Sequence, residues 1–303
     1  MVPNVSVIVP AFNAARTLPA CLESLVAQRY PRSRYEILAV DNRSADRTAD
    51  IIRSYGVTYL SETTRQSSYA ARNRGLRRAT GEIIAFTDAD CVADSDWLMN
   101  GVSCFEDATV GGVAGKIGDA SPVTVVQEYL HEALAQEGAL SHPYLPYAQT
   151  ANAFYRREVW QTVGAFEASW TSGGDADLAW RMQRSTAYRL TYCESALVWH
   201  QHRATRRAHF QQRRTWGRGE VCLYKRYRAG YRDRGVSYGP RECLRDYMQL
   251  MRMTGRALAL WGRKVFKRGS AKEYEFALCD WLGELGNRIG RIEGSVKNRV
   301  WYP

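Results

Sequence analysis

Two aspartates separated by one residue, Asp88 and Asp90, directly follow a short apolar run at residues 83–86. The run is continuous rather than alternating, which predicts a strand buried on both faces. Ligands of open α/β sheets bind beyond the carboxyl ends of strands, and alternation along an extended strand end would send both carboxylates to the same side. Paired anionic oxygens suit a divalent cation shared with substrate phosphates. The alternative is a loop whose aspartates only cap the next helix.

The elements that must position these aspartates alternate along the first hundred residues. Strands are expected at 5–9, 35–40, 57–60 and 83–87, and helices are expected from Thr17, after Ser44 and from Ser67. This βαβ order predicts an α/β fold whose mainly parallel sheet is flanked by helices. It also places Pro10, Asp41 and the aspartate pair at the carboxyl ends of three strands, on one edge.

Asp41 ends the second apolar run, so it is not expected in the core. A carboxylate at this edge is placed to accept a hydrogen bond from a ring N–H, as it does from a pyrimidine base. The alternative is an Asx-turn or a cap for the following helix.

Four segments in fixed order resemble the nucleotide-sugar half of a family 2 (GT-A fold) inverting glycosyltransferase: SVIVPAFNAARTL, VDNRSADRT, AARNRG and GEIIAFTDAD. The resemblance implies a GT-A, Rossmann-like fold, a nucleotide-sugar donor and a divalent cation, Mn²⁺ or Mg²⁺. The donor-binding residues that it implies are Pro10, Ala11, Asn13, Asp41, Arg72, Asn73, Asp88, Ala89 and Asp90. Among them Asp41 would recognise the nucleobase and Asp90 would ligate the metal. Many members carry two aspartates where this chain has Asp41 and Asn42.

The second half should carry the acceptor side and the catalytic base. Asn152 lies in a segment that resembles the acceptor-lining stretch of the family, and Gly173 and Gly174 free the backbone to approach a ligand. Asp175 follows at a predicted helix start, which stabilises the charged carboxylate that a base requires. The family usually has Glu-Asp where this chain has Gly174-Asp175, so Asp175 takes the base role and Asp177 is the second candidate. The alternative is that both are only first-turn helix charges.

Two further segments carry candidate ligands. A strand is predicted to end at His200 and His202, and a neutral imidazole can complete a Mn²⁺ shell begun by a carboxylate. In related transferases a histidine after such a strand has this part, and His200 matches the position better. Arg213 and Arg214 lie in a basic, Trp-containing segment that resembles the one placed over the donor diphosphate. Thr215 breaks the full QxxRW pattern, so processive polymer synthesis is not supported.

The chain is strongly basic only in its last third. Residues 1–200 hold 18 Lys+Arg and 22 Asp+Glu, whereas residues 201–303 hold 24 and 9. This favours an anionic partner there, either a membrane surface, a polyanionic acceptor or a nucleic acid, and a merely solvated basic region is the alternative. No nucleic-acid motif is present, so no nucleic acid is expected. Apolar helical stripes in this region either pack on the catalytic domain or lie on an anionic bilayer.

Cysteine usage and the N-terminus bear on the compartment. The seven cysteines are scattered without a CxxC pair, which argues against disulfides and a zinc site. The first residues read as a strand rather than a signal peptide, and no run approaches a membrane span. The protein is expected to be cytoplasmic, or peripheral on the inner face of the membrane.

The sequence therefore predicts a GT-A domain over residues 1–210 and a basic helical C-terminal region over 211–303. The first domain divides into a nucleotide-sugar half, 1–100, and an acceptor half, 101–210. The expected activity is metal-dependent inverting transfer from a UDP-sugar to an acceptor hydroxyl in polysaccharide, glycolipid or other glycoconjugate biosynthesis, with a sugar, lipid-linked or polysaccharide acceptor. The alternative is a non-catalytic module that binds a nucleotide-sugar or a polyanion.

Overall fold

The computed structural model describes residues 2–131, 136–235, 238–266 and 269–302. The chain divides into two compact units. The first comprises residues 1–120 and 134–201, and the second comprises residues 121–133 and 202–303.

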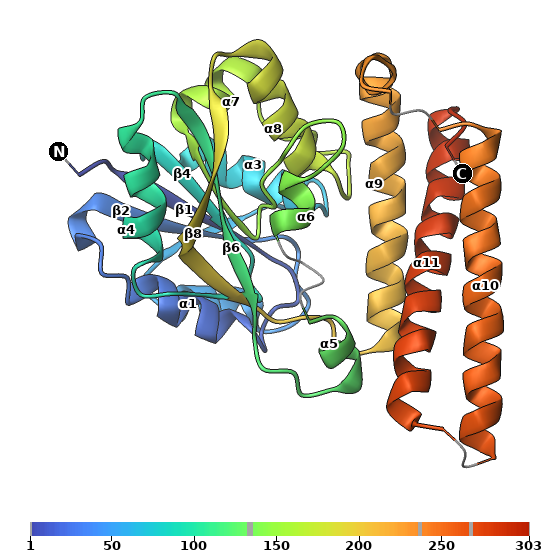
Figure 1. Cartoon of the computed structure of the whole chain (residues 1–303). Helices are drawn as coiled ribbons and strands as arrows, with labels where there is room; N and C mark the ends of the chain where they lie inside the picture. The colour runs from blue at the N-terminus through green and yellow to red at the C-terminus, as the bar shows by residue number, and fades with distance from the viewer. Residues whose placement is uncertain (1, 132–135, 236–237, 267–268, 303) are drawn as a thin grey trace. The chain divides into compact units, whose positions relative to one another are not determined.

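The first unit is built on one mixed sheet with the strand order β3-β2-β1-β4-β7-β6-β8-β5 (Figure 1). Its strands are β1 (Val5–Ala11), β2 (Tyr35–Asp41), β3 (Thr58–Ser61), β4 (Ile83–Thr87), β5 (Cys91–Ala93), β6 (Val110–Asp119), β7 (Asn152–Arg156) and β8 (Arg189–His200). The half that the sequence predicts, β3-β2-β1-β4, is parallel. Strands β7 and β5 run antiparallel to their neighbours, so the second half is mixed.

Helices cover both faces of this sheet. They are α1 (Leu18–Val26), α2 (Thr48–Ser54), α3 (Ser68–Arg78), α4 (Trp97–Ser103), α6 (Gln136–Leu140), α7 (Arg157–Val163) and α8 (Gly174–Ser185), with short 3₁₀ turns at Arg32–Arg34 and Cys104–Glu106. The predicted start of α3 is confirmed, because the Ser67 hydroxyl accepts a hydrogen bond from the Tyr69 N–H at 3.3 Å and caps the helix.

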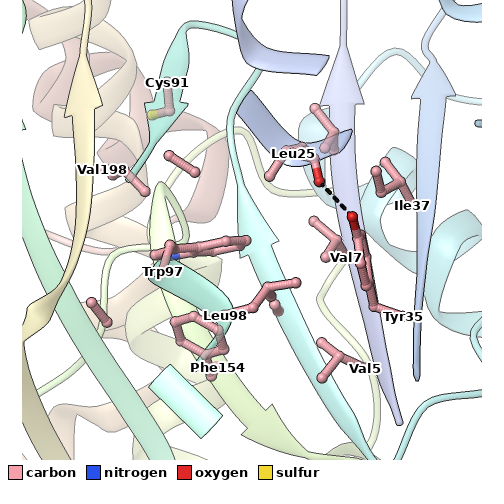
Figure 2. Close-up of a cluster of buried hydrophobic side chains, with 14 of the residues drawn as sticks. Val5, Val7, Leu25, Tyr35, Ile37, Cys91, Trp97, Leu98, Phe154 and Val198 are labelled. Atoms are coloured by element: carbon pink, nitrogen blue, oxygen red, sulfur yellow. Dashed lines mark hydrogen bonds between the residues drawn. The ribbon is translucent and has the colours of Figure 1, made fainter. Parts of the chain in front are cut away.

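Alternation along β1 divides the core between the two faces. Val5 and Val7 pack on one side with Leu25 of α1 and Trp97 of α4 (Figure 2). Ile8 points to the other side, where α3, α7 and α8 supply the packing. The Tyr35 hydroxyl donates to the Leu25 carbonyl at 3.2 Å, the dashed line of Figure 2, and so joins α1 to β2. A core on both faces holds the strand ends in fixed register.

The second unit is helical, as predicted. It contains α5 (Val125–Tyr129), α9 (Arg206–Asp233), α10 (Pro240–Val265) and α11 (Ala271–Asn298). The predicted boundary after residue 210 falls inside α9, because that helix begins at Arg206 and its first kink comes only at Tyr227. Residues 121–133 also belong here, and the Tyr129 hydroxyl donates to Asp280 of α11 at 2.6 Å.

Helix α11 contacts α9 through glycines, a contact that the sequence did not predict. A Cβ at Gly290 would lie 2.0 Å from the Arg214 carbonyl oxygen, and one at Gly217 would lie 2.2 Å from the Asn287 carbonyl oxygen. These two helices therefore approach each other too closely for any side chain at those positions. Within the described ranges, none of the helices has an apolar stretch that could cross a bilayer.

Candidate active site

Polar residues gather at the carboxyl ends of β1 and β2, where Ala11 lies in register with Asp41. Asp41 is 6% exposed, and its Oδ1 accepts a hydrogen bond from the Ser44 N–H at 3.2 Å. Asn13 has a left-handed backbone at φ 47°, and its Oδ1 accepts from the Ala45 N–H at 2.8 Å. The two strand-end loops are thus tied together, and the base-binding role of Asp41 remains a prediction.

The hydrogen bonds that Asn42 donates explain why this chain has an asparagine where many family members have an aspartate. Its Nδ2 donates to the carbonyls of Glu62 at 3.1 Å and Arg65 at 2.8 Å, and the residue is 3% exposed. A carboxylate has no proton to donate and would face two carbonyl oxygens. The amide therefore holds the loop after β3 against the Asp41 edge.

The aspartate pair lies in a turn and not at an extended strand end. Strand β4 ends at Thr87, and the Cys91 N–H donates to the Asp88 carbonyl at 3.0 Å. The alternation argument for placing both carboxylates on one side is therefore wrong. Asp88 and Asp90 have different partners, and Ala89 between them is buried.

Asp88 pairs with a buried arginine. Its Oδ1 accepts from Nη2 of Arg72 at 2.5 Å, and the Arg72 side chain is only 4% exposed. The buried Nε of Arg72 has no hydrogen-bond partner among the described residues. Burying a guanidinium N–H without a partner is costly, so this side chain has donor capacity for a bound anion or polar group.

The side chain of Asp90, which directly precedes β5, lies beside His200 at the end of the neighbouring strand β8. Asp90 Oδ1 lies 3.7 Å from His200 Nε2, and the side chains are 17% and 4% exposed. The pairing of β5 with β8 brings the two side chains together, because Cys91 of β5 is in register with His200 of β8. One carboxylate oxygen and one imidazole nitrogen form a donor set suited to Mn²⁺ or another divalent cation with open positions. No group of three or more acidic, His or Cys side chains that could hold a metal occurs in the described ranges, so further ligands would come from substrate or water.

Asp175 lies in the first turn of α8, where the sequence predicted it. Burial raises the pKa of Asp175, while the backbone N–H of Ala176 and the Arg72 guanidinium pull that pKa down. The negative charge of Asp88 also raises the pKa of Asp175, so both members of the Arg72–Asp88 pair act on this carboxyl group. The result is a carboxylate that is more basic than a solvated one.

Asp177, the second candidate base, has no exposed surface. Its Oδ2 accepts from Arg181 Nε at 3.0 Å, and Arg181 also donates to the carbonyls of Gly164 at 2.8 Å and Ala165 at 2.9 Å. Asp177 thus anchors the arginine that ties α8 to the loop after α7. This placement favours Asp175 as the base.

Tyr69 is a site residue that sequence reasoning missed. Its hydroxyl oxygen accepts from the Gly174 N–H at 2.9 Å, and its ring stacks on Phe166 at 5.5 Å. A Cβ at Gly174 would lie 2.8 Å from the Tyr69 ring. Tyr69 therefore fills the space that a glutamate at 174 would need, which explains the departure from the Glu-Asp pattern. The sequence offered one indication of its role: Tyr69 lies one helical turn before Arg72, which was predicted to bind the donor.

Replacing Gly174 with alanine should destabilise this corner. The added methyl group must displace the Tyr69 ring, and overpacking of this kind costs about 1–3 kcal/mol. Thermal unfolding of Gly174→Ala against the parent chain measures the loss. Gly138→Ala is the matched control, because a Cβ there meets nothing within 4 Å. An unchanged melting temperature for Gly174→Ala would show that the Tyr69 contact is not tight.

The remaining predicted residues have structural partners. Asn73 exchanges two hydrogen bonds with the Phe166 backbone, at 2.8 and 3.0 Å. Asn152 is fully buried, accepts from Trp97 Nε1 at 2.8 Å and donates to two carbonyls at 2.7 Å. Asn152 cannot contact an acceptor because its side chain is buried, where its hydrogen bonds join β7 to β6 and β8.

Both predicted diphosphate arginines lie on α9 in the second unit. Arg214 pairs with Glu293 of α11, and Arg213 lies over the Trp216 ring at 5.3 Å. Their contact with a donor remains a prediction.

Gly173 is the N-cap residue of α8. Its backbone has a left-handed φ of 83°, a conformation that favours glycine at this position.

The chain belongs to a known enzyme family: residues 6–214 match the family described as Glycosyl transferase family 2. It is therefore a glycosyltransferase, and the resemblance inferred from its motifs is confirmed. It is similar to Glycosyltransferase AglE of Haloferax volcanii, 35% identical over 213 residues that cover 65% of this chain and 67% of that protein. The chain spans about half to two thirds of the length of the curated relatives that it matches first.

Solved structures confirm the GT-A fold. Mannosyltransferase PcManGT of Pyrobaculum calidifontis, in complex with GDP-Man and Mn²⁺, gives a TM-score of 0.63 at 22% identity, covering 96% of this chain and 88% of that one. Glucosyl-3-phosphoglycerate synthase of Mycobacterium tuberculosis, in complex with Mn²⁺, UDP-glucose and phosphoglyceric acid, gives 0.55 at 17% identity, covering 78% and 81%.

Proposed function

We propose that this glycosyltransferase transfers a sugar from a UDP-sugar to an acceptor hydroxyl with inversion, in a metal-dependent reaction. The observation that carries the proposal is a group of three charges that act on one another: Asp175, the buried Arg72 and Asp88. It combines a carboxylate of raised pKa with an arginine that has an unused buried donor. Such perturbed and undersatisfied groups cluster at reactive sites.

The base has a single task in this reaction. Asp175 accepts the proton of the acceptor hydroxyl while that oxygen forms a bond to the anomeric carbon from the face opposite the leaving group. The bond from that carbon to the diphosphate oxygen breaks in the same step, and its electron pair stays on the diphosphate. Atoms and charge balance, because the proton ends on Asp175 and the new negative charge on the diphosphate. A raised pKa makes the carboxylate a stronger proton acceptor near neutral pH.

The departing diphosphate needs stabilisation as its charge grows. Asp90 and His200 would hold a divalent cation, which when bound supplies electrostatic stabilisation of that leaving group. Arg213 and Arg214 are proposed as additional diphosphate contacts. Both solved relatives are described in complex with Mn²⁺, which supports the choice of cation.

Asp41 makes uridine the proposed base, since its carboxylate can accept from the ring N–H of a pyrimidine. The mycobacterial relative is described with UDP-glucose and the Pyrobaculum relative with GDP-Man, so guanosine is the competitor to test. The proposed acceptor is a hydroxyl of a lipid-linked sugar or polysaccharide, which fits the excess of basic residues in 201–303.

A thermal-shift screen of UDP, GDP, CMP and dTDP with Mn²⁺, Mg²⁺ or EDTA tests the donor site. A ligand at a hundred times its Kd stabilises the native state by about 2.7 kcal/mol. We expect UDP to raise the melting temperature in Mn²⁺ and to lose that effect in EDTA. A shift with GDP alone would replace the uridine assignment, and no shift with any nucleotide would contradict the donor site.

A further inference from the structure

Helix α10 exposes an apolar stripe over its whole length. None of its residues is buried. The stripe comprises Leu244, Met248, Met251, Leu258 and Val265, whose exposed fractions run from 47% to 72%. Steps of three, four and seven residues place all of them on one helical face. Contiguous exposed apolar surface of this kind marks a site of interaction.

A row of arginines runs beside this stripe. Its members, Arg241, Arg245, Arg252, Arg256 and Arg263, are all exposed, and they too are spaced by four or seven residues. Arg245 and Arg252 each directly follow a stripe residue, which turns them by about 100° to one side of it. An apolar stripe and a cationic row therefore lie side by side along the exposed surface of α10.

The two acidic residues of α10 are engaged in contacts within the second unit, and one of them, Asp246, also lies 3.9 Å through Oδ1 from Nε of Arg245 in the arginine row. Glu242 Oε2 accepts from the Gly239 N–H at 2.9 Å and completes the cap of the helix. Asp246 Oδ2 accepts from Arg288 of α11 at 2.7 Å and from the Tyr238 hydroxyl at 3.0 Å. Both carboxylates are thus engaged within the second unit.

A cavity of about 630 Å³ adjoins the N-terminal half of α10. Cys243 and Tyr247 of α10 line one side, and Ile292, Val296 and Trp301 are among the residues that line the rest. Val296 is 76% exposed and Trp301 is 66% exposed. The apolar surface of the stripe thus continues into a recess that can take an alkyl chain.

We propose that α10 docks on an anionic lipid bilayer, with its stripe among the acyl chains and its arginines at the headgroups. The positive charge of α10 decides whether a lipid bilayer or a second copy of the chain covers this surface. A second copy of the chain would bring two arginine rows together with no available carboxylate on either α10, whereas acidic headgroups match them. Arginine stems can lie along apolar surface while their guanidinium groups reach the phosphates. This surface lies entirely in the second unit, so the inference does not depend on the proposed transfer reaction.

Vesicle co-sedimentation of the full chain tests the proposal, with no nucleotide present. We expect binding to vesicles that contain phosphatidylglycerol, weaker binding to pure phosphatidylcholine, and loss of the difference at high salt. Leu258→Glu should weaken binding to anionic vesicles at least about tenfold, because it places a charge in the apolar stripe. Gln211→Glu is the matched control: it adds the same charge to an exposed position of the second unit that lies on α9, outside both the stripe and the arginine row.

The arginine row is tested separately. Arg252→Gln with Arg256→Gln should reduce binding to anionic vesicles about twenty-five-fold, since each basic residue near such a surface contributes about fivefold. Circular dichroism checks that each variant keeps its helices. Equal binding of the parent chain and Leu258→Glu would overturn the proposal. So would a dimer in sedimentation equilibrium that Leu258→Glu dissociates, because the stripe would then bind a second copy.

Discussion

Asp175→Asn should reduce turnover by at least about a hundredfold while UDP still binds. The carboxylate is the proposed proton acceptor, and general-base assistance contributes about a hundredfold to ten-thousandfold. Asparagine keeps the size and the hydrogen-bonding oxygen at the start of α8 but accepts no proton at neutral pH. Sugar-transfer rates and the UDP thermal shift, measured on the same preparation, separate chemistry from binding.

Asp177→Asn is the matched control for this substitution. It makes the same chemical change two residues away, at a fully buried carboxylate that pairs with Arg181. Breaking a buried pair costs stability, so a lower melting temperature is expected with turnover per folded molecule largely kept. If Asp177→Asn removes turnover and Asp175→Asn does not, the base assignment is wrong. If donor binds but neither parent nor variant transfers sugar to any acceptor, the non-catalytic module is the better description.

The pH profile gives an independent test of Asp175. Only the deprotonated carboxylate can accept a proton, so turnover must fall as pH decreases through its pKa. Burial raises that pKa above the usual value for aspartate of about 3.9, so this acid limb should lie at correspondingly higher pH. A rate that stays constant down to pH 4 would contradict the assignment.

The parallel half of the sheet and the position of Asp175 follow from the sequence because both depend on local pattern. Apolar strand runs and a glycine pair before a helix are read directly from residue order. Asp88 and Asp90 show the limit of such reasoning: alternation holds only while the chain stays extended, and here it turns after Thr87.

Amides and aromatic residues at the site were harder to assign. Asn42 and Asn152 carry the same groups as ligand-binding amides. Only their tertiary hydrogen bonds show that both are buried and join neighbouring segments of the chain. Tyr69 looks like an ordinary core aromatic, since nothing in the local sequence pairs it with Gly174, 105 residues away. The close approach of α9 and α11 was missed because glycine adds nothing to an apolar stripe.

Asp90→Ala should remove the effect of Mn²⁺ on UDP binding and reduce transfer by at least about a hundredfold. Asp90 and His200 are the paired donors at the strand ends, and loss of one electrostatic stabiliser of a leaving group costs about two to three orders of magnitude. Thermal shifts with UDP in Mn²⁺ and in EDTA measure the first effect. Asp96→Ala is the control: this residue lies beyond β5 at the start of α4, and its ion pair with Arg29 at 3.2 Å is on the surface and contributes little. Equal UDP binding by the parent chain in Mn²⁺ and in EDTA would exclude a metal role for Asp90. An effect of Asp96→Ala as large as that of Asp90→Ala would instead show that loss of any carboxylate around β5 disturbs the site, so the Asp90 result would not identify a metal ligand.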